Sequence, residues 1–496
     1  MLLQGPVKIW RKQALLWGAL FLCIFVIWNG YKSARLEPAL LQYEAKFSIF
    51  YRNYKTFGLG ARHLFPFYNF EQTNPPKGNY LSESPFLPLT MYAAARVFGD
   101  QPLTYRSIIV IINIFFFVLL SFFVGRRWGV RPALWTLFFA ALSPYAFYYG
   151  YEQSYEQLCV LGMFSSVFLY FEWFQNRKDK YLILSLVAYA IGFSASYLAF
   201  FSAFSICIHY LLFEKRKSRV EFFKLSSFAW LTAGYVLFMS VLIQTTGLSV
   251  KAWFGRAVVR ATGVSILELR SALLNYPLQF FGPLLTITAT LYFLFKHKEN
   301  KTREPVSDLM LLYALLIPGL LTVLIFKNLY VIHPYIVVFL LPFFAVSGAL
   351  GVDHLLQRFR GTWSKRIIAS LFALGFLVSS LSSPDIKELF HPSPPGVHGR
   401  LADLSRTIQN EIKPQDQLIV LGDEDQALKV TAFYILGIPT IDLNSDEELV
   451  QELTQRSNTL ILCTSEKAIN RIKTFEGAIL IVQNQDLAFF RISERP

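Results

Sequence analysis

Residues 104–124 read TYRSIIVIINIFFFVLLSFFV, an apolar run in which Arg106 is the only charged residue. About 20 such residues suffice to carry an α-helix across the hydrocarbon core of a bilayer. The same test applied along the chain gives about eleven candidate spans, at 14–30, 104–124, 132–149, 155–174, 181–197, 198–213, 225–247, 276–295, 305–326, 331–351 and 366–384. The sequence therefore predicts a polytopic α-helical membrane protein.

The composition and the charge pattern support this prediction. Of the 496 residues, 54% are hydrophobic and 17% aromatic, more than soluble domains usually contain. The net charge is +14, and the basic residues gather on every second loop, at 126–131, 177–180, 215–219, 296–303 and 358–366. By the positive-inside rule these loops and the basic N-terminus are cytoplasmic, and the C-terminus lies outside. We expect no nucleic-acid partner, because no soluble basic domain carries the excess charge.

The N-terminus predicts the location of the protein. Basic residues precede an apolar stretch from Ala14 to Trp28, and no small-residue cleavage site follows, so we interpret it as an uncleaved signal anchor in the inner (plasma) membrane. The four cysteines lie in apolar runs, with a spacing typical of neither a zinc site nor a disulfide framework.

The sequence changes character after Pro384, which predicts a transmembrane domain at 1–384 and an extracytoplasmic α/β domain at 385–496. Strand-like runs occupy Gln417–Leu421, Ile438–Leu443, Thr459–Cys463, Ala478–Val482 and Leu487–Ile492, and helical patterns lie at 424–435, 446–456 and 465–474. Such alternation favours a small, largely parallel sheet.

The long outer loop at 31–103 contains two predicted interfacial helices. In the first, apolar residues recur at helical spacing between Leu36 and Tyr54, which predicts a helix lying flat in the membrane interface with Glu44 beside its apolar stripe. The second, at 86–98, follows Glu83. Glu44 and Glu83 are candidate catalytic acids. The alternative is a boundary carboxylate paired with Lys46 or Arg52 for Glu44, and a helix N-terminal charge for Glu83.

Candidate ligands of a lipid phosphate lie at two further places. Lys327, His333 and Tyr335 occur where two spans meet the outer interface, and Arg256 and Arg260 lie one turn apart in a predicted interfacial helix within 248–275. Charge-assisted bonds to phosphate are strong where water is scarce. The alternatives are an aromatic-belt anchor with a snorkelling lysine, and arginines that touch only anionic headgroups.

Other polar groups give weaker indications. Glu152 and Glu156 are one helical turn apart between two spans, which fits either a sugar pocket or a polar turn. Asp423-Glu-Asp425 has the D-x-D form of metal-dependent sugar transferases, but acids are also expected where a helix begins after a strand. We therefore predict no metal site, and the sequence indicates no cofactor or divalent metal.

Several stretches together resemble a known family. Three stretches resemble the first outer loop of the polyprenyl-phosphate-sugar-dependent glycosyltransferases of the GT-C fold. They are Glu44 with Tyr51-Arg-Asn-Tyr-Lys-Thr-Phe-Gly58, then Glu83-Ser-Pro-Phe-Leu-Pro-Leu89, and then Ala95-Arg-Val-Phe-Gly99. Protein O-mannosyltransferases and the aminoarabinose transferase of lipid A belong to that group. Leu142–Gly150 and His333–Pro342 are similar to later motifs of the family. The resemblance covers about 1–384.

The resemblance implies an inverting transfer of one sugar from a polyprenyl phosphate to an acceptor of the cell envelope, which is a glycan, lipid or protein. Glu44 matches the acid that deprotonates or positions the acceptor, Glu83 the second acid, and Tyr335 the tyrosine that holds the leaving phosphate. Arg52, in the first motif, joins the expected phosphate ligands. Two positions depart from the pattern: Glu44 replaces an aspartate, and Ser84 stands where aminoarabinose transferases have a lysine.

Two other functions remain as alternatives. A transporter or lipid flippase usually has ionisable groups at mid-membrane and inverted repeats, and this sequence shows neither pattern. A non-catalytic envelope scaffold, whose outer domain binds partners, would accommodate both departures from the family pattern.

Overall fold

A computed structural model covers the chain. The structure describes residues 38–60, 84–150, 154–214, 219–245, 249–299, 307–382, 401, 404, 407–408, 412, 416–421, 440–441, 459–474, 478–484 and 487–492. The predicted span at 14–30 and the predicted helices at 424–435 and 446–456 lie outside these ranges.

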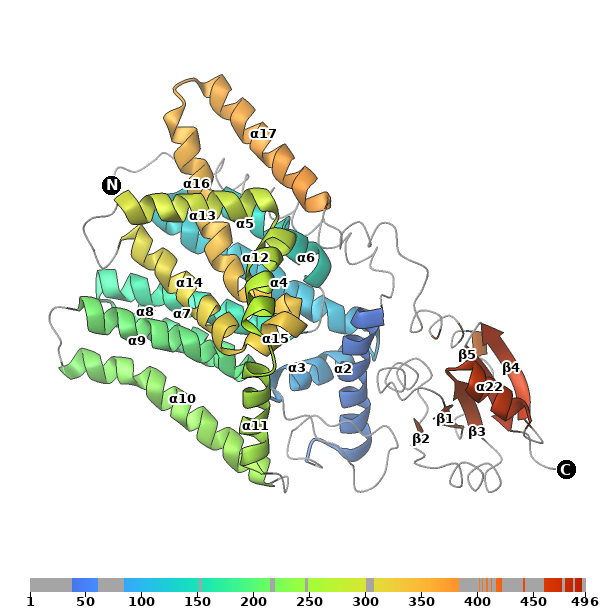
Figure 1. Cartoon of the computed structure of the whole chain (residues 1–496). Coiled ribbons are helices and arrows are strands. Elements are labelled where there is room, and N and C mark those ends of the chain that lie inside the picture. Colours follow the sequence, from blue (N-terminus) through green and yellow to red (C-terminus); the bar gives the residue numbers. More distant parts are fainter. Residues whose placement is uncertain are drawn as a thin grey trace. The chain divides into compact units, whose positions relative to one another are not determined.

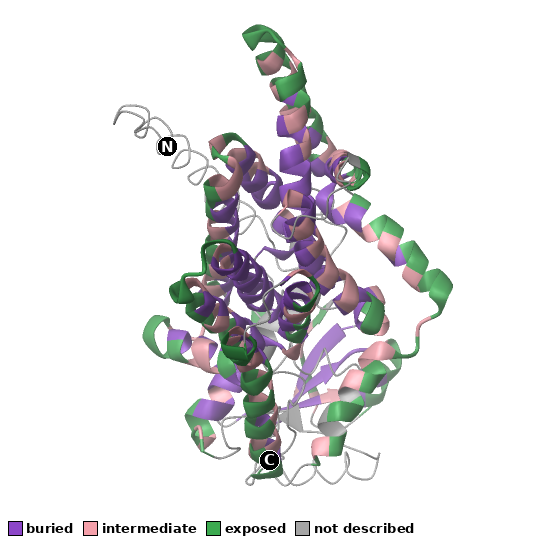
Figure 2. Cartoon of the chain, turned by 90° about the vertical axis from the view of Figure 1, so that its left-hand side faces the viewer, coloured by how far each residue is buried: buried purple, intermediate pink, exposed green. Residues whose placement is uncertain are grey.

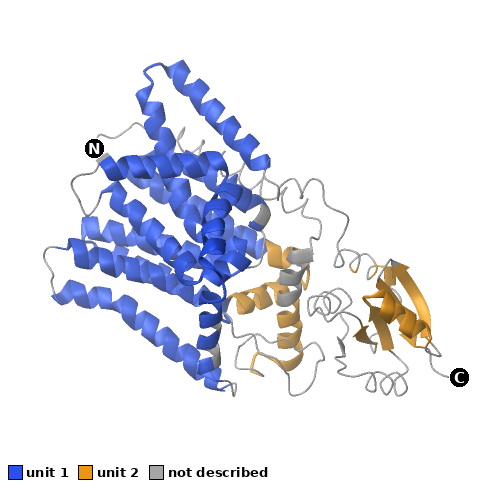
Figure 3. Ribbon diagram, in the orientation of Figure 1, with its two compact units in different colours: residues 1–33, 82–86, 107–390 blue, residues 34–81, 87–106, 391–496 orange. Residues whose placement is uncertain are grey.

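The chain divides into two compact units (Figure 3). The first comprises residues 1–33, 82–86 and 107–390, and the second comprises residues 34–81, 87–106 and 391–496. Helix α4 (Pro102–Trp128) begins in the second unit and continues in the first. The predicted division of the chain at residue 384 stays a prediction.

The first unit is entirely helical in its described part (Figure 1). After α4 come α5 (Val130–Ala141), α6 (Pro144–Tyr149), α7 (Glu156–Asn176), α8 (Asp179–Ala195), η1 (Tyr197–Ala199), α9 (Phe200–Phe213), α10 (Arg219–Thr245), α11 (Val250–Ala261), α12 (Ile266–Phe281), α13 (Pro283–Glu299), α14 (Asp308–Ile325), α15 (Lys327–Ile332), η2 (Pro334–Leu340), α16 (Leu341–Arg358) and α17 (Thr362–Leu381). Within the described ranges, six helices are long and apolar enough to cross a membrane, or seven if one bent pair is counted as a span. The predicted polytopic helical membrane fold is confirmed.

The span predicted at 276–295 is not one straight helix, because the chain bends at Gly282. Helices α12 and α13 meet at an angle of 114°. Gly282, between them, has a φ of 82°, a conformation that glycine adopts without steric cost. Pro283 then begins the new helix, where its missing N–H is tolerated. The residues after 265, predicted as interfacial, belong to α12.

Among the candidate spans, the most buried are α7 and the segment Pro334–Arg358. Of their most apolar 18 residues, 89% and 94% are buried, compared with 17% in α10 and 11% in α17. Figure 2 shows that buried residues gather in the central helices of the molecule. The outer helices therefore present apolar side chains such as Trp230 and Leu371 to the surroundings, as a lipid environment requires. Helices α7 and α8 pack with their backbones in contact, because a Cβ atom added at Gly162 would lie 2.4 Å from the Cα atom of Gly192.

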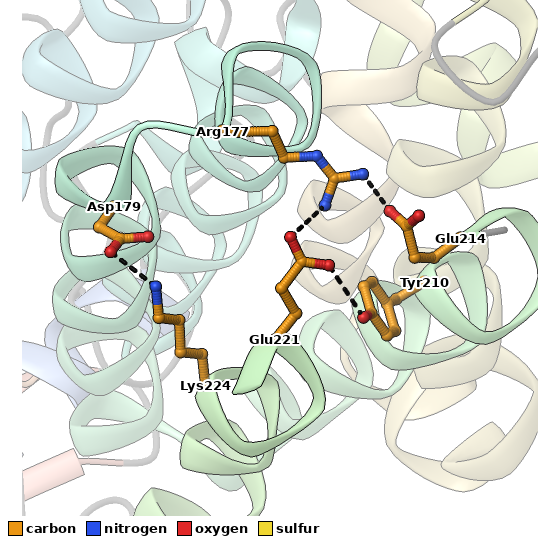
Figure 4. A network of polar contacts seen from close by, with 6 residues as sticks. All are labelled: Arg177, Asp179, Tyr210, Glu214, Glu221 and Lys224. Atoms are coloured by element: carbon orange, nitrogen blue, oxygen red, sulfur yellow. Dashed lines mark hydrogen bonds and ion pairs between the residues drawn. The ribbon is translucent and has the colours of Figure 1, made fainter. Parts of the chain in front are cut away.

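A polar network joins the ends of α7, α9 and α10 (Figure 4). Arg177 forms ion pairs with Glu214 and, at 3.2 Å, with Glu221. Tyr210 donates a hydrogen bond to Glu221 at 3.3 Å. Nearby, Lys224 pairs with Asp179 at 2.6 Å. These contacts hold the ends of the three helices together, next to the basic loops at 177–180 and 215–219 that are predicted to be cytoplasmic.

The two helices predicted in the loop at 31–103 agree with their predicted positions. Helix α2 spans Pro38–Phe57 and α3 spans Phe86–Phe98. The apolar side chains of Phe47, Phe50 and Tyr54 are each 1% exposed, so protein covers this part of the stripe that we expected in the membrane interface.

The C-terminal sheet contains β1 (Gln417–Leu421), β2 (Thr440–Ile441), β3 (Thr459–Cys463), β4 (Ala478–Asn484) and β5 (Leu487–Ile492), in the order β2-β1-β3-β5-β4. Strand β1 is parallel to β2 and β3, but β5 is antiparallel to β3 and β4. The expectation of a largely parallel sheet is therefore wrong for β3, β5 and β4. Between β4 and β5 the reason is the connection, because neighbouring strands separated by only two residues pair as an antiparallel hairpin. The predicted helix at 465–474 is α22 (Glu466–Lys473), packed on the sheet through Ile469 and Ile472.

Candidate functional site

An aromatic cluster lies where α6, α12, α15 and η2 of the first unit meet. The ring centre of Tyr335 lies 5.3 Å from that of His333 and 6.0 Å from that of Tyr149. Tyr149 also packs against Phe280 at 5.3 Å. Tyr149 and Tyr335 are both buried. The structure thus brings the predicted residues His333 and Tyr335 together with a phenol from a distant part of the chain.

Hydrogen bonds hold the short helix α15 against its neighbours. The hydroxyl of Tyr276 on α12 donates to the carbonyl of Val331 at 2.8 Å. At the other end of α15, the amide of Asn328 donates to the carbonyl of Val259 on α11 at 2.9 Å. Helix α15 is therefore fixed to both α11 and α12, which sets the positions of the residues at its two ends.

Arg260, in the last turn of α11, lies close to the start of α15. Its Nη1 donates to the hydroxyl of Tyr197 at 2.7 Å, and the guanidinium lies 5.7 Å from the centre of that ring. The Tyr197 ring packs in turn against Phe326 at 5.6 Å, and Phe326 immediately precedes Lys327. The predicted phosphate ligands Arg260 and Lys327 therefore belong to one neighbourhood.

Lys327 is half-buried and lies at the first position of α15. Within the described part of the chain, its ammonium has neither an ion-pair nor a hydrogen-bond partner. A half-buried cation without a counter-charge favours an anionic ligand. Along α15 the backbone rises by about 9 Å between Lys327 and His333.

Arg52, by contrast, already has a counter-ion in the second unit. Its Nε donates to the carboxylate of Asp100 at 2.9 Å. The same carboxylate accepts hydrogen bonds from the hydroxyls of Ser48 at 2.8 Å and Tyr105 at 2.7 Å. A phosphate bound by Arg52 would have to compete with this carboxylate.

The side chains of three predicted site residues lie outside the described part of the structure. Glu44 belongs to α2 and Arg256 to α11, but the side chains of both lie outside the described residues, as does the whole of Glu83. Their roles stay predictions. The candidate metal ligands Asp423 and Asp425 also lie outside the described ranges.

A buried polar network supports α6 and the start of α7. The amide of Asn113 on α4 donates to the carbonyl of Gly150 at 2.8 Å. Gln157 Nε2 donates to the hydroxyl of Tyr145 at 3.3 Å and to the carbonyl of Tyr149 at 3.4 Å. These contacts fix Tyr149, which packs on Tyr335. Glu156, in the first turn of α7, is 5% exposed and so is a buried carboxylate beside this network.

Sequence reasoning missed Asp100, Tyr197 and Tyr276. Asp100 directly follows Gly99, a glycine that ends an amphipathic helix. A charged residue directly after a helix-ending glycine is visible in the sequence and could have indicated a residue with a structural role. Tyr197 and Tyr276 have no such signal, because tyrosines are common throughout this chain.

Tyr54, outside the spans, is an unsuitable base because burial raises the pKa of its phenol well above the ordinary value.

The comparisons with known proteins agree on the fold. Residues 82–244 match the model of the family described as dolichyl-phosphate-mannose-protein mannosyltransferase. No curated protein sequence matches the chain. Among solved structures, ArnT from Cupriavidus metallidurans bound to undecaprenyl phosphate is 10% identical with a TM-score of 0.65, covering 99% of this chain and 100% of that one.

Two further structures are similar. The Archaeoglobus fulgidus oligosaccharyltransferase in its apo form is 12% identical with a TM-score of 0.61, over 92% of this chain and 70% of that one. The arabinofuranosyltransferase AftD from Mycobacteria is 12% identical with a TM-score of 0.52, over 97% of this chain and 40% of that one. The chain therefore has the GT-C membrane fold of the polyprenyl-phosphate-dependent glycosyltransferases, and its residues 82–244 carry the sequence pattern of the dolichyl-phosphate-mannose-protein mannosyltransferase family.

Proposed function

We propose that this protein is an integral membrane glycosyltransferase that moves one sugar from a polyprenyl-phosphate donor to a cell-envelope acceptor, with inversion of configuration. The proposal places the active site at the outer face of the inner membrane, the N-terminus in the cytoplasm and the C-terminal domain outside. The family match over residues 82–244 and the fold shared with an ArnT structure that contains undecaprenyl phosphate support the donor class.

The observation that carries the proposal is Lys327, a half-buried lysine at the start of α15, near which Arg260 is held through Tyr197 and Phe326. In the proposed reaction these two cations neutralise the phosphate that leaves with the lipid, assisted by Arg256, His333 and the phenol of Tyr335. The burial of Tyr335 and its packing against Tyr149 and His333 restrict the rotamers of the phenol, which is a requirement for an oriented hydrogen bond.

The acceptor hydroxyl needs a base, and we assign this role to Glu44 with Glu83 as the second acid. Glu44 lies on α2, which is anchored over its last three turns by buried aromatic side chains. An ionised carboxylate accepts the hydroxyl proton while the hydroxyl oxygen attacks the anomeric carbon and the bond to the lipid phosphate breaks. No step of this scheme requires a metal ion.

The test combines donor binding and sugar transfer in proteoliposomes, with labelled polyprenyl-phosphate sugars and a crude envelope acceptor. Lys327→Met should weaken binding of undecaprenyl phosphate by roughly 10- to 100-fold, because a hydrogen bond to a charged group contributes about 1.5–3 kcal/mol. Lys298→Met, which removes an exposed lysine at the end of α13, should not change binding. Glu44→Gln should leave binding intact and lower transfer by roughly 100-fold or more.

The outcomes separate the alternatives. Equal donor affinity of the wild type and Lys327→Met would remove Lys327 from the site. Transfer that is unchanged in Glu44→Gln would keep the enzyme class and move the base to another residue. Binding of donor or glycan without any turnover by the wild type, over a panel of lipid-linked sugars, would favour a non-catalytic scaffold.

A further inference from the structure

The carboxylate of Asp100 joins three helices of the second unit at one point. It accepts hydrogen bonds from Ser48 and Arg52 on α2 and from Tyr105 in the first turn of α4, at 2.7 to 2.9 Å. The side chain of Asp100 is only 16% exposed and that of Arg52 23% exposed, so the ion pair is largely shielded from water. Three donors directed at one carboxylate define its position more narrowly than a single surface ion pair does.

The turn that carries Asp100 is itself rigid. Gly99 ends α3 with a φ of 91°, and its amide donates to the carbonyl of Ala95 at 3.0 Å. The carbonyl of Gly99 accepts hydrogen bonds from the amide of Gln101 at 3.1 Å and from the hydroxyl of Thr104 at 2.9 Å. Asp100 is therefore held by the helix before it and the helix after it.

The contacts on α2 fall on the side of the helix that contains position 44. Positions 44, 48 and 52 are separated by four residues each, so they share one stripe that turns through about 80° over two helical turns. Ser48 and Arg52 are thus anchored on the stripe to which Glu44 belongs, while Phe47, Phe50 and Tyr54 bury the neighbouring face. The rotation of α2 about its axis is fixed by both sets of contacts together.

We infer that Asp100 is a positioning residue, which sets the orientation of α2 and thereby aims position 44 at the reacting acceptor. This inference rests on the proposed function, in which Glu44 is the base. Packing of Tyr51 and Tyr54 against Tyr92, at 5.7 and 5.5 Å between ring centres, keeps α2 beside α3 but tolerates small rotations. The directional hydrogen bonds to Asp100 restrict those rotations.

The test compares the wild type with Asp100→Asn and Asp100→Glu in the full-length protein. An amide at position 100 presents a donor where Arg52 Nε also donates, so the ion pair is lost with little change in volume. We expect kcat for transfer to fall by roughly 10- to 100-fold, since misplacement by about 1 Å costs a catalytic group that much. KM for the donor should stay within about twofold, and the acidic limb of the pH–rate profile should not move, because Glu44 still provides the base. Asp179→Asn, which breaks an exposed ion pair elsewhere, is the matched control.

A distance measurement tests the same inference without turnover. Spin labels at the exposed positions Thr56 on α2 and Val97 on α3, in a background without native cysteines, report the geometry of the two helices. Asp100→Asn should broaden the distance distribution and Asp179→Asn should not. If the wild type transfers no sugar, the proposed function fails, and this distribution alone decides whether Asp100 orients α2.

Three results would overturn the inference. An unchanged distance distribution would show that Asp100 does not fix α2. Unchanged kcat in a folded Asp100→Asn protein would show that the orientation does not matter for transfer. A changed KM for the donor with kcat retained would assign the Arg52–Asp100 pair to donor binding instead.

Discussion

The polar network around Arg177, which joins the ends of α7, α9 and α10, allows the effect of a substitution on stability to be predicted from its contacts. The Arg177 guanidinium pairs with Glu214 and Glu221 and lies 5.2 Å from the ring centre of Trp173 and 4.7 Å from that of Phe174. Arg177 also has a φ of 53°, the left-handed conformation that disfavours every side chain. Arg177→Ala removes the charged contacts and keeps this backbone strain, whereas Arg177→Gly removes both.

The expected magnitude follows from burial. The side chain of Arg177 is 39% exposed, which limits its ion pairs to about 0.2–1 kcal/mol each. The side chain of Glu214 is only 8% exposed, so the loss of one of its charged contacts costs a further contribution of about 1–3 kcal/mol. The ring contacts contribute about 0.5–1 kcal/mol. Because these contributions overlap, we expect Arg177→Ala to lower the free energy of unfolding by about 2–3 kcal/mol. Arg177→Gly should be about 1 kcal/mol less destabilised than Arg177→Ala, because glycine adopts the left-handed conformation freely.

The assay is reversible unfolding of the purified protein in mixed micelles, titrated with a denaturing detergent and followed by tryptophan fluorescence. Arg360→Ala, in the exposed turn between α16 and α17, controls for the loss of one positive charge. Stability of Arg177→Ala within about 0.5 kcal/mol of the wild type would refute the reasoning about Glu214. A glycine variant less stable than the alanine variant would refute the backbone argument.

Two further predictions concern the second unit. Gly99→Ala should destabilise the protein by about 1–2 kcal/mol in the same assay, because the φ of 91° at this position is strained for alanine. The control Gly234→Ala, in the regular helix α10, should not destabilise the protein. Equal stability of the two variants would contradict the argument. Cys463 should resist a thiolate-directed maleimide at pH 8 until the protein is unfolded, because burial raises the pKa of its thiol to about 12. Because the pKa of the Cys463 thiol is higher in the folded than in the unfolded protein, its contribution to stability is complete below the unfolded pKa near 9. This contribution is lost as the pH rises from 9 toward 12. Rapid labelling of the native protein at pH 8 would contradict the burial of the thiol.

Local sequence determined most of the helices. An apolar run long enough to cross a bilayer folds as a helix wherever it lies, because its backbone groups have no other partners in lipid. The runs at 104–124 and 305–326 therefore predicted α4 and α14, and the pattern at 86–98 predicted α3 with its correct ends. The prediction of phosphate ligands near residues 327–335 also rests on local chemistry, since cations and phenols at the end of a span are visible in the sequence, and it stays a prediction.

Tertiary structure decided which charges remain available. From sequence alone, Arg52, Arg260 and Lys327 are three equivalent cations at the outer side. In the structure, Arg52 is neutralised by Asp100, which is 48 residues away, whereas Arg260 donates to the neutral hydroxyl of Tyr197, 63 residues away. No local pattern encodes such pairs, because they depend on how the helices pack.

The bend at Gly282 shows the same limit within the membrane. Hydropathy measures how apolar a segment is and contains no direction, so the run at 276–295 satisfied the test for one straight span although the backbone turns by 114° in its middle. Sequence thus determined that this chain is a multi-span helical membrane protein, because burial in lipid depends on each segment's own composition. Tertiary packing determined the bend, the pairing of each charge and the grouping of Tyr149, His333 and Tyr335, because these depend on contacts between segments far apart in the chain.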